Sequence, residues 1–258
     1  MSNQILEVKD LCKTYIVNKR QNNILRNLNF QMEEGDFVAV MGPSGSGKST
    51  MLYTVSGMDR LTAGEVTLGG KTISILPEKK MSEVRLNEMG FIFQQMHMLR
   101  NLSIYDNIII SAYHSGLGRT REGRTKINQY ALELMKKLDI IDIADNDITE
   151  VSGGQLQRAC ICRALINRPK MIFADEPTGA LNSKAAKEVM DELNKLNREG
   201  STILLVTHDV KVAAKTDKVL YIMDGNIEGE FTLGKYSNES TMKERERILN
   251  SWLLDMGW

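Results

Sequence analysis

The sequence predicts an α/β protein with a mainly parallel sheet, a small antiparallel β lobe and an inserted helical lobe. Five short apolar runs predict the sheet, because they are nearly continuous rather than alternating, as in strands buried on both faces. The runs are FVAVM (37–41), FIF (91–93), MIFAD (171–175), ILLVT (203–207) and VLYIM (219–223). Longer amphipathic segments separate them, and this alternation of strand and helix favours a parallel arrangement.

Two of the amphipathic segments have clear helical spacing. From Ile127 to Leu138, apolar residues recur at intervals of three and four positions. A second helix is predicted from about Ser183 to Gly200, a glycine suited to a helix C-terminus. We expect a loop at the basic stretch GRTREGRTK (118–126) between helices.

The two lobes follow from the segments around these elements. ILEVKDLCKTY and ILRNLNFQM precede the first strand of the main sheet, GEVTLGGKTIS follows its first helix, and all three resemble short antiparallel strands. Residues from about 95 to 165 form the predicted helical lobe. We expect one catalytic domain over residues 1–235 and an amphipathic helical extension over 236–258, which docks on its own domain or on a partner subunit.

Composition narrows the class of partners. Lys and Arg together number 33, as do Asp and Glu, so no net charge attracts the chain to a polyanion, and nucleic acid is not an expected partner. No apolar run approaches the roughly 20 residues that cross a bilayer, which predicts a soluble cytoplasmic protein. Three cysteines are too few and too poorly spaced for a disulfide framework, and Cys160 and Cys162 are expected to be buried thiols.

A glycine-rich loop directly follows the strand FVAVM and precedes a helix. GPSGSGKST fits the Walker A pattern G-x-x-x-x-G-K-[ST], in which backbone amides and a helix N-terminus hold phosphate oxygens. Lys48 then reaches the β and γ phosphates of ATP, and the Ser49 hydroxyl is placed to ligate Mg²⁺. The predicted ATP-binding residues are Gly42, Pro43, Ser44, Gly45, Ser46, Gly47, Lys48, Ser49 and Thr50.

Polar residues at three other strand ends complete a hydrolytic site. Asp175 suits a Walker B aspartate that holds Mg²⁺ or its water, and Glu176 is placed to polarise the attacking water. His208 follows ILLVT and is expected to contact the γ-phosphate. Gln94, after GFIF, offers an amide oxygen to Mg²⁺ or water.

A second anion-binding turn lies about a hundred residues after the first. Ser152, Gly153, Gly154 and Gln155 open a helix whose free amides suit phosphate oxygens, but the turn has no lysine and no metal ligand. It therefore supplies half a site. Two copies of the chain related by a twofold axis complete it, because each Walker A loop then faces the other copy's turn across one ATP.

These motifs together resemble the nucleotide-binding subunits of ABC transporters. The resemblance covers about residues 5–230 and is closest to the MacB/LolD-type subgroup, which includes exporters of lipoproteins and antimicrobial peptides. It implies that Tyr15 stacks on adenine, that Gln94 marks the loop coupled to an integral membrane permease, and that the Ser152 turn contacts the partner's ATP. It also implies a homodimeric ATPase that lies on the inner face of the cell membrane and meets the membrane only through its permease.

Two residues depart from the family's usual pattern. Val151 replaces a leucine, a small apolar change. Asn182 stands where an aspartate is usual, in the loop that touches the opposite subunit, and this loses a charge. The segment from Met96 to Tyr105 is either a groove for the permease or ordinary packing of the helical lobe.

The function expected is ATP hydrolysis that energises a separate permease. One alternative keeps the ATPase but transmits a mechanical signal through a membrane partner, as in cell-division relatives. A second is an ABC ATPase that acts on DNA or ribosomes, and a third is a nucleotide-gated clamp that binds ATP without turnover.

Overall fold

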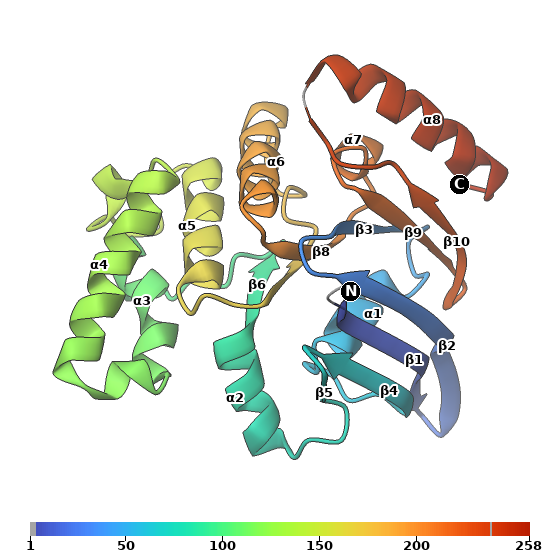
Figure 1. The fold of residues 1–258 in the computed structure, drawn as a ribbon, viewed down its shortest axis with the longest axis horizontal. Coiled ribbons are helices and arrows are strands. Elements are labelled where there is room, and N and C mark those ends of the chain that lie inside the picture. The colour runs from blue at the N-terminus through green and yellow to red at the C-terminus, as the bar shows by residue number, and fades with distance from the viewer. Residues whose placement is uncertain (1–3, 238) are drawn as a thin grey trace. The chain divides into compact units, whose positions relative to one another are not determined.

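The computed structural model describes residues 4–237 and 239–258, which form two compact units (Figure 1). The first unit takes the chain up to Met81 and from Asn194 onward, and the second takes Ser82–Leu193. Helices α2 (Glu78–Glu88) and α6 (Ser183–Arg198) each cross a boundary between the units. The second unit thus includes the predicted helical lobe together with two strands.

An antiparallel sheet forms the predicted small β lobe of the first unit. Its strand order is β2-β1-β4-β5, with β1 (Gln4–Val17), β2 (Arg20–Glu33), β4 (Ala63–Leu68) and β5 (Lys71–Thr72). Asn18 and Lys19 join β1 to β2 and have φ angles of 52° and 62°. A two-residue turn with both φ angles positive matches the right-handed twist of the strands it connects, so it fixes the register of this long hairpin.

The parallel strands of the first unit are those that the apolar runs predict. β3 (Phe37–Met41) pairs in parallel with β8 (Thr202–Val206) and with β9 (Lys218–Met223). Every residue of β3 and β8 is buried, which explains their continuous apolar sequences. Helix α1 (Lys48–Val55) follows β3, and the short α7 (Val210–Ala213) follows β8.

A further strand and a long helix end the first unit. β10 (Asn226–Thr232), which the sequence analysis missed, pairs antiparallel with β9. Helix α8 (Met242–Asp255) is the last helix of the chain in Figure 1. It packs on its own unit through Leu249 and Leu253, both fully buried. Of the two alternatives for the extension, docking on its own domain is the one observed.

The second unit contains the parallel pair β6 (Met89–Phe93) and β7 (Met171–Asp175) with helices α3 (Ile104–His114), α4 (Arg121–Lys137) and α5 (Gly153–Leu165). α4 begins at Arg121, so the prediction of a loop over 118–126 is wrong for most of that stretch. The Thr120 side chain accepts a hydrogen bond from the Gly123 amide and caps the helix. The basic residues Arg121 and Arg124 lie exposed in its first turn.

Buried cysteines and short 3-10 turns complete the description. Cys160 and Cys162 are fully buried in α5, as expected, and burial raises the pKa of Cys160 to about 11. Single 3-10 turns lie at Leu117–Arg119, Ile141–Ile143 and Glu239–Thr241. Within the described ranges, no helix is both long and apolar enough to span a bilayer.

Candidate functional site

The Walker A loop has the backbone that its glycines predict. A side chain on Gly42 would place its Cβ 2.0 Å from the carbonyl oxygen of Ile222, so only glycine fits there. Gly47 has a φ of 103° and precedes α1, whose first turn it closes by accepting a hydrogen bond from the Met51 amide at 2.7 Å. The loop therefore directs the N-terminus of α1, with its positive dipole end, toward its own interior.

Lys48 and Ser46 point polar atoms into this loop. Nζ of Lys48 donates hydrogen bonds to the carbonyl oxygens of Gly42 and Pro43, each at 2.8 Å. The Ser46 side chain is buried, and its hydroxyl has no hydrogen-bond partner among the described residues. A buried hydroxyl without a partner costs free energy unless a ligand satisfies it, so the loop fits an anion such as a phosphate group.

Tyr15 lies at the edge of the same loop. Its hydroxyl donates a hydrogen bond to Asp59, and its ring carries Nζ of Lys13 at 4.5 Å from the centroid. Burial and the neighbouring Asp59 carboxylate raise the pKa of Tyr15 to about 12, while a hydrogen bond with Thr50 opposes the rise. The structure thus brings Tyr15 to Thr50, the last residue of the loop. Lys13 and Asp59, which the sequence analysis did not single out, hold the ring in place.

His208 belongs to the same unit as the loop and lies beside it. It follows β8, and Asp209 after it caps α7 by accepting a hydrogen bond from the Lys211 amide at 2.7 Å. His208 lines a hollow of about 320 Å³ together with Gly42, Pro43 and Ser44. The structure thus places His208 beside the phosphate loop, and its contact with a γ-phosphate stays a prediction. Gly257 and Trp258 line this hollow too, which no motif in the sequence indicated.

The second unit gathers the predicted acids and Gln94. β6 and β7 pair Phe93 with Asp175, so Gln94 and Glu176 follow at the same end of neighbouring strands. A Cβ built on Gly179 would lie 2.9 Å from Nε2 of Gln94 and 3.2 Å from Oε2 of Glu176, so both side chains converge over this glycine. Glu176 has a φ of 45°, a strained backbone for a residue with a side chain and one often found at functional sites.

The Ser152 turn is a capping box. The Ser152 hydroxyl accepts a hydrogen bond from the Gln155 amide at 3.3 Å, and Oε1 of Gln155 accepts one from the Ser152 amide at 2.9 Å. The sequence Ser-x-x-Gln could have predicted this arrangement. A phosphate at this turn would meet the free amides of the first turn of α5, while the box keeps that turn rigid.

The same turn shares a hollow with the loop that carries Asn182. The hollow has a volume of about 310 Å³, and its lining includes Ser152, Gly153, Gly154 and Asn182. Oδ1 of Asn182 accepts a hydrogen bond from the Ala185 amide at 2.9 Å and caps α6. Arg158, which also lines the hollow, pairs with Glu188 at 3.0 Å. Thus the second unit presents one hollow built from the two segments predicted to meet a partner subunit.

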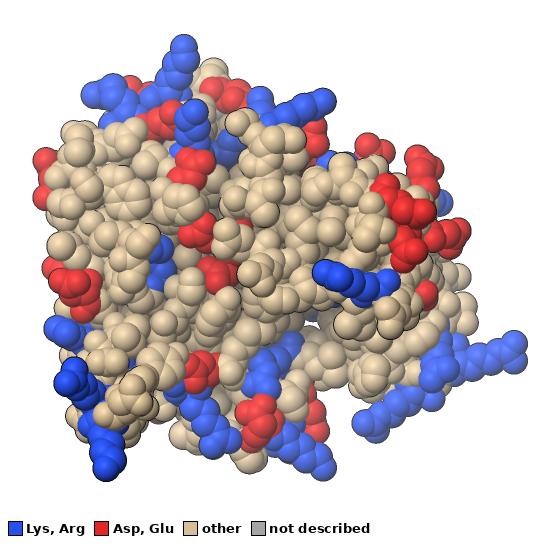
Figure 2. All heavy atoms as spheres, turned by 180° about the vertical axis from the view of Figure 1, so that it is seen from behind, with Lys and Arg blue, Asp and Glu red and all other residues tan. Residues whose placement is uncertain are grey.

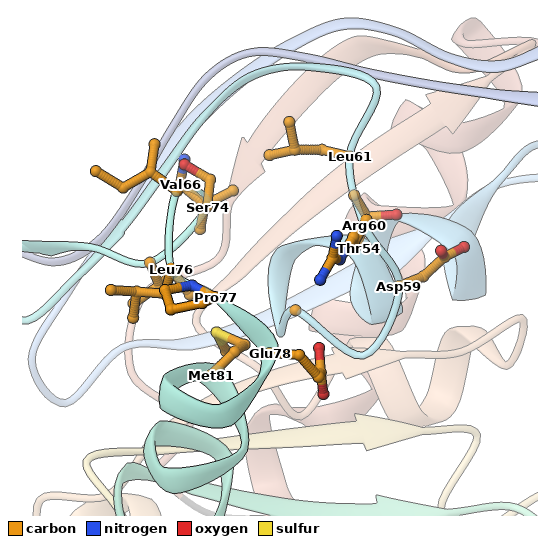
Figure 3. A pocket seen from close by; sticks show the side chains of 13 residues that line it. Thr54, Asp59, Arg60, Leu61, Val66, Ser74, Leu76, Pro77, Glu78 and Met81 are labelled. Carbon is orange, nitrogen blue, oxygen red and sulfur yellow. The ribbon is translucent and has the colours of Figure 1, made fainter.

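A further cavity of about 450 Å³ lies in the first unit (Figure 3). Thr54 of α1, Val66 of β4 and Met81 of α2 are part of its lining, and none of residues 42–50 is. Asp59, the hydrogen-bond partner of Tyr15, also lines this cavity.

Comparison with known proteins then identifies the family. The model of the ABC transporter family matches residues 25–179. This chain belongs to the ABC transporter family. It is 37% identical over 223 residues to the uncharacterised ABC transporter ATP-binding protein YknY of Bacillus subtilis, covering 86% of this chain and 95% of that one. It is 36% identical over 241 residues to the bacitracin export ATP-binding protein BceA of Halalkalibacterium halodurans, covering 93% of both chains.

The comparison also includes a much longer relative and a solved structure. The ABC chain is 40% identical over 221 residues to the macrolide export ATP-binding/permease protein MacB of Chlorobium luteolum, but spans only 32% of its length. A solved dimeric ABC cassette, MJ0796 bound to ADP and Pi, superimposes with a TM-score of 0.79 at 37% identity over 89% of this chain and 99% of that one. The predicted fold class, the family and its ATPase activity are confirmed.

Proposed function

We propose that this ABC ATPase dimerises around ATP and energises a permease in the membrane. The observation that carries the proposal is the division of the phosphate-binding features between two hollows. One hollow holds the Walker A loop with His208, and the other holds the Ser152 turn with Asn182. The dimeric cassette MJ0796, similar over most of its length, supports a pairing of two copies.

The proposed chemistry assigns a task to each polar group. Lys48, already inside the phosphate loop, would donate hydrogen bonds to the β and γ phosphates. His208 would hold the γ-phosphate. Glu176 would orient and polarise the attacking water, and its left-handed backbone conformation is of the kind often found at functional sites.

Magnesium is the proposed cofactor beside ATP. Ser49, Gln94 and Asp175 would hold it, since hydroxyl, amide and carboxylate oxygens are the ligands that Mg²⁺ prefers. When bound, the ion neutralises charge on the phosphates. Asp175 ends β7 with 8% of its surface exposed, so its carboxylate is well shielded from solvent.

The proposed contact with the permease is the segment that follows Gln94. Arg163 fixes it by donating to the carbonyl oxygens of Met96 at 2.6 Å and His97 at 2.9 Å. Asn107 fixes its far end through bonds to both backbone groups of Leu99. The Leu99 side chain is nevertheless 51% exposed. An exposed apolar side chain on a rigid loop suits a docking contact, and relatives named as exporters support a permease as the partner.

The overall charge gives no reason to expect a polyanionic partner. Lysine and arginine side chains lie among acidic ones on the face shown in Figure 2. A net charge of zero provides no long-range attraction to a nucleic acid. We propose that the chain lies on the inner face of the cell membrane, held there by its permease.

The test measures solution mass with Mg-ATP alongside phosphate release for wild type and Glu176→Gln. We expect wild type to release phosphate and stay monomeric, whereas the variant, which binds ATP but does not cleave it, becomes an ATP-dependent dimer. Glu133→Gln, an exposed carboxylate on α4, is the matched control and should behave as wild type. Phosphate release by Glu176→Gln at the wild-type rate would reject its assigned task.

A further inference from the structure

The chain segment after α8 reaches the phosphate loop. Gly257 and Trp258 line the hollow formed by Gly42, Pro43, Ser44 and His208, although more than 200 residues of sequence separate them from the three loop residues. All six residues belong to the first unit. Trp258 therefore lies at the side of the loop where, in the proposed function, the γ-phosphate and a second copy meet.

The end of α8 is shaped to send Trp258 to this place. The Trp258 amide donates to the carbonyl oxygen of Leu253 at 2.9 Å, and the Gly257 amide donates to that of Leu254 at 3.1 Å. With Gly257 at a φ of 89°, this is a Schellman motif, which reverses the chain at a helix C-terminus. The turn thus fixes the direction in which the indole leaves the helix.

α8 itself is firmly anchored. The buried Arg245 side chain donates to four backbone carbonyl oxygens, those of Ala214, Leu233, Thr216 and Gly234, at 2.6–3.0 Å. Trp252 stacks on Phe231 with ring centroids 5.2 Å apart. A Cβ on Gly229 would lie 2.9 Å from Trp252, so β10 leaves room for this ring. These contacts pack α8 firmly against the rest of the first unit.

Trp258, by contrast, is partly exposed. Its ring packs edge-on against Tyr221 at 6.2 Å, and 39% of its surface is exposed. Tyr221 is the register partner of Met41, the residue before Gly42. The indole thus lies between strand β9 and the phosphate loop and makes an aromatic contact with Tyr221. A second copy of the chain is able to displace a ring held in this way.

We propose that Trp258 restrains closure of the ATP-bound dimer: it lines the loop-side hollow onto which a second copy would close, and it must move when that copy arrives. This inference rests on the proposed function. The restraint is proposed to act on closure and not on ATP capture, because Lys48 and Tyr15, the proposed nucleotide contacts, have hydrogen-bond partners in Gly42 and Asp59 and not in the tail.

The experiment uses the full chain carrying Glu176→Gln and follows the dimer by solution mass as ATP is added. Trp258→Ala should lower the ATP concentration at half-maximal dimer by roughly two- to twelvefold, the factor that corresponds to loss of one aromatic pair. Trp258→Phe, which keeps an edge-on ring, should give a smaller change. Leu254→Ala removes a 68% exposed side chain from the same helix and should give none.

Fluorescence gives a direct readout of the same movement. The protein has two tryptophans, so Trp252→Phe leaves Trp258 as the only one. We expect ATP to change the emission of Trp258 in the Glu176→Gln background, and ADP to leave it unchanged. Thermal unfolding of each variant separates a loss of fold from a change in closure.

The outcomes distinguish the two proposals. If Glu176→Gln dimerises with ATP but Trp258→Ala leaves the midpoint unchanged or raises it, the restraint is wrong and the proposed function stands. If Trp258→Ala is needed before Glu176→Gln dimerises, the restraint is supported in its strongest form. If neither dimerises, the pairing of half-sites is wrong, and the restraint falls with it.

Discussion

The hydroxyl of Tyr15 donates a hydrogen bond to Oδ2 of Asp59, and Nζ of Lys13 donates to the other carboxylate oxygen at 2.6 Å. Since Lys13 also lies over the Tyr15 ring, the three side chains fix the plane of that ring beside Thr50. A ring held in one plane loses little entropy when a base stacks on it. This relationship explains how an otherwise exposed tyrosine serves as the proposed adenine platform.

Replacement of Tyr15 tests that platform. Tyr15→Ala should weaken ATP binding by about 1–3 kcal/mol, the usual cost of losing one aromatic ring under a base. Tyr15→Phe keeps the ring and loses only the bond to Asp59, so its effect should be much smaller. Titration of ATP and of inorganic tripolyphosphate, which has no base, provides the measurement. Equal losses for both ligands would show that Tyr15 acts through the fold of the loop and not by stacking.

Asp59 should make the free energy of unfolding depend on pH in the acidic range. Burial raises the pKa of its carboxyl group, but the hydrogen bonds from Lys13 and Tyr15 outweigh burial and hold the pKa below the ordinary 3.8. A group whose pKa is lowered on folding stabilises the folded state above its unfolded pKa, and this contribution is lost as pH falls through the folded pKa. The difference in free energy of unfolding between wild type and Asp59→Asn should therefore be largest near neutral pH and shrink below about pH 4. If the difference in free energy of unfolding between the two proteins stays constant over this range, the Asp59 carboxylate does not stabilise the fold through these hydrogen bonds.

Asn182 has a structural task that does not require a charge. Because its side chain caps α6 through the Ala185 amide, Asn182→Ala should lower the free energy of unfolding by about 1 kcal/mol. Asn182→Asp keeps the cap and adds a charge that the helix dipole favours, so stability should be equal or slightly higher. Chemical unfolding measures both variants. If dimer formation with ATP also changes in Asn182→Asp at unchanged stability, the lost charge matters to coupling between subunits.

Much of the fold could be predicted from buried strands and the phosphate loop. β3 and β8 are evident in the sequence because every residue is buried and all but Thr202 are apolar. β10 does not, because its side chains alternate between half-buried and exposed and it contains Gly229. The meeting of Trp258 with Gly42 has no local signal at all, since it follows from the packing of α8 against distant strands. Sequence motifs therefore predict the residues of the site, whereas residues such as Trp258 come to the site only through contacts between distant segments.

Arg245 should be the residue that holds the tail in place. Its guanidinium is 7% exposed, burial lowers its pKa, and it satisfies four backbone carbonyl oxygens. Arg245→Ala would leave these acceptors without donors, so we expect a loss of about 3 kcal/mol in the free energy of unfolding. Arg247 provides the matched control, because it lies on the same helix, faces solvent and pairs with Glu244 at 2.6 Å; Arg247→Ala should leave the unfolding midpoint unchanged. Denaturant unfolding monitored by tryptophan emission reports directly on α8, which carries Trp252 and leads into Trp258. Equal midpoints for the two arginine variants would mean that the four bonds do not anchor the tail, and Trp258 would then lose its fixed place beside the phosphate loop.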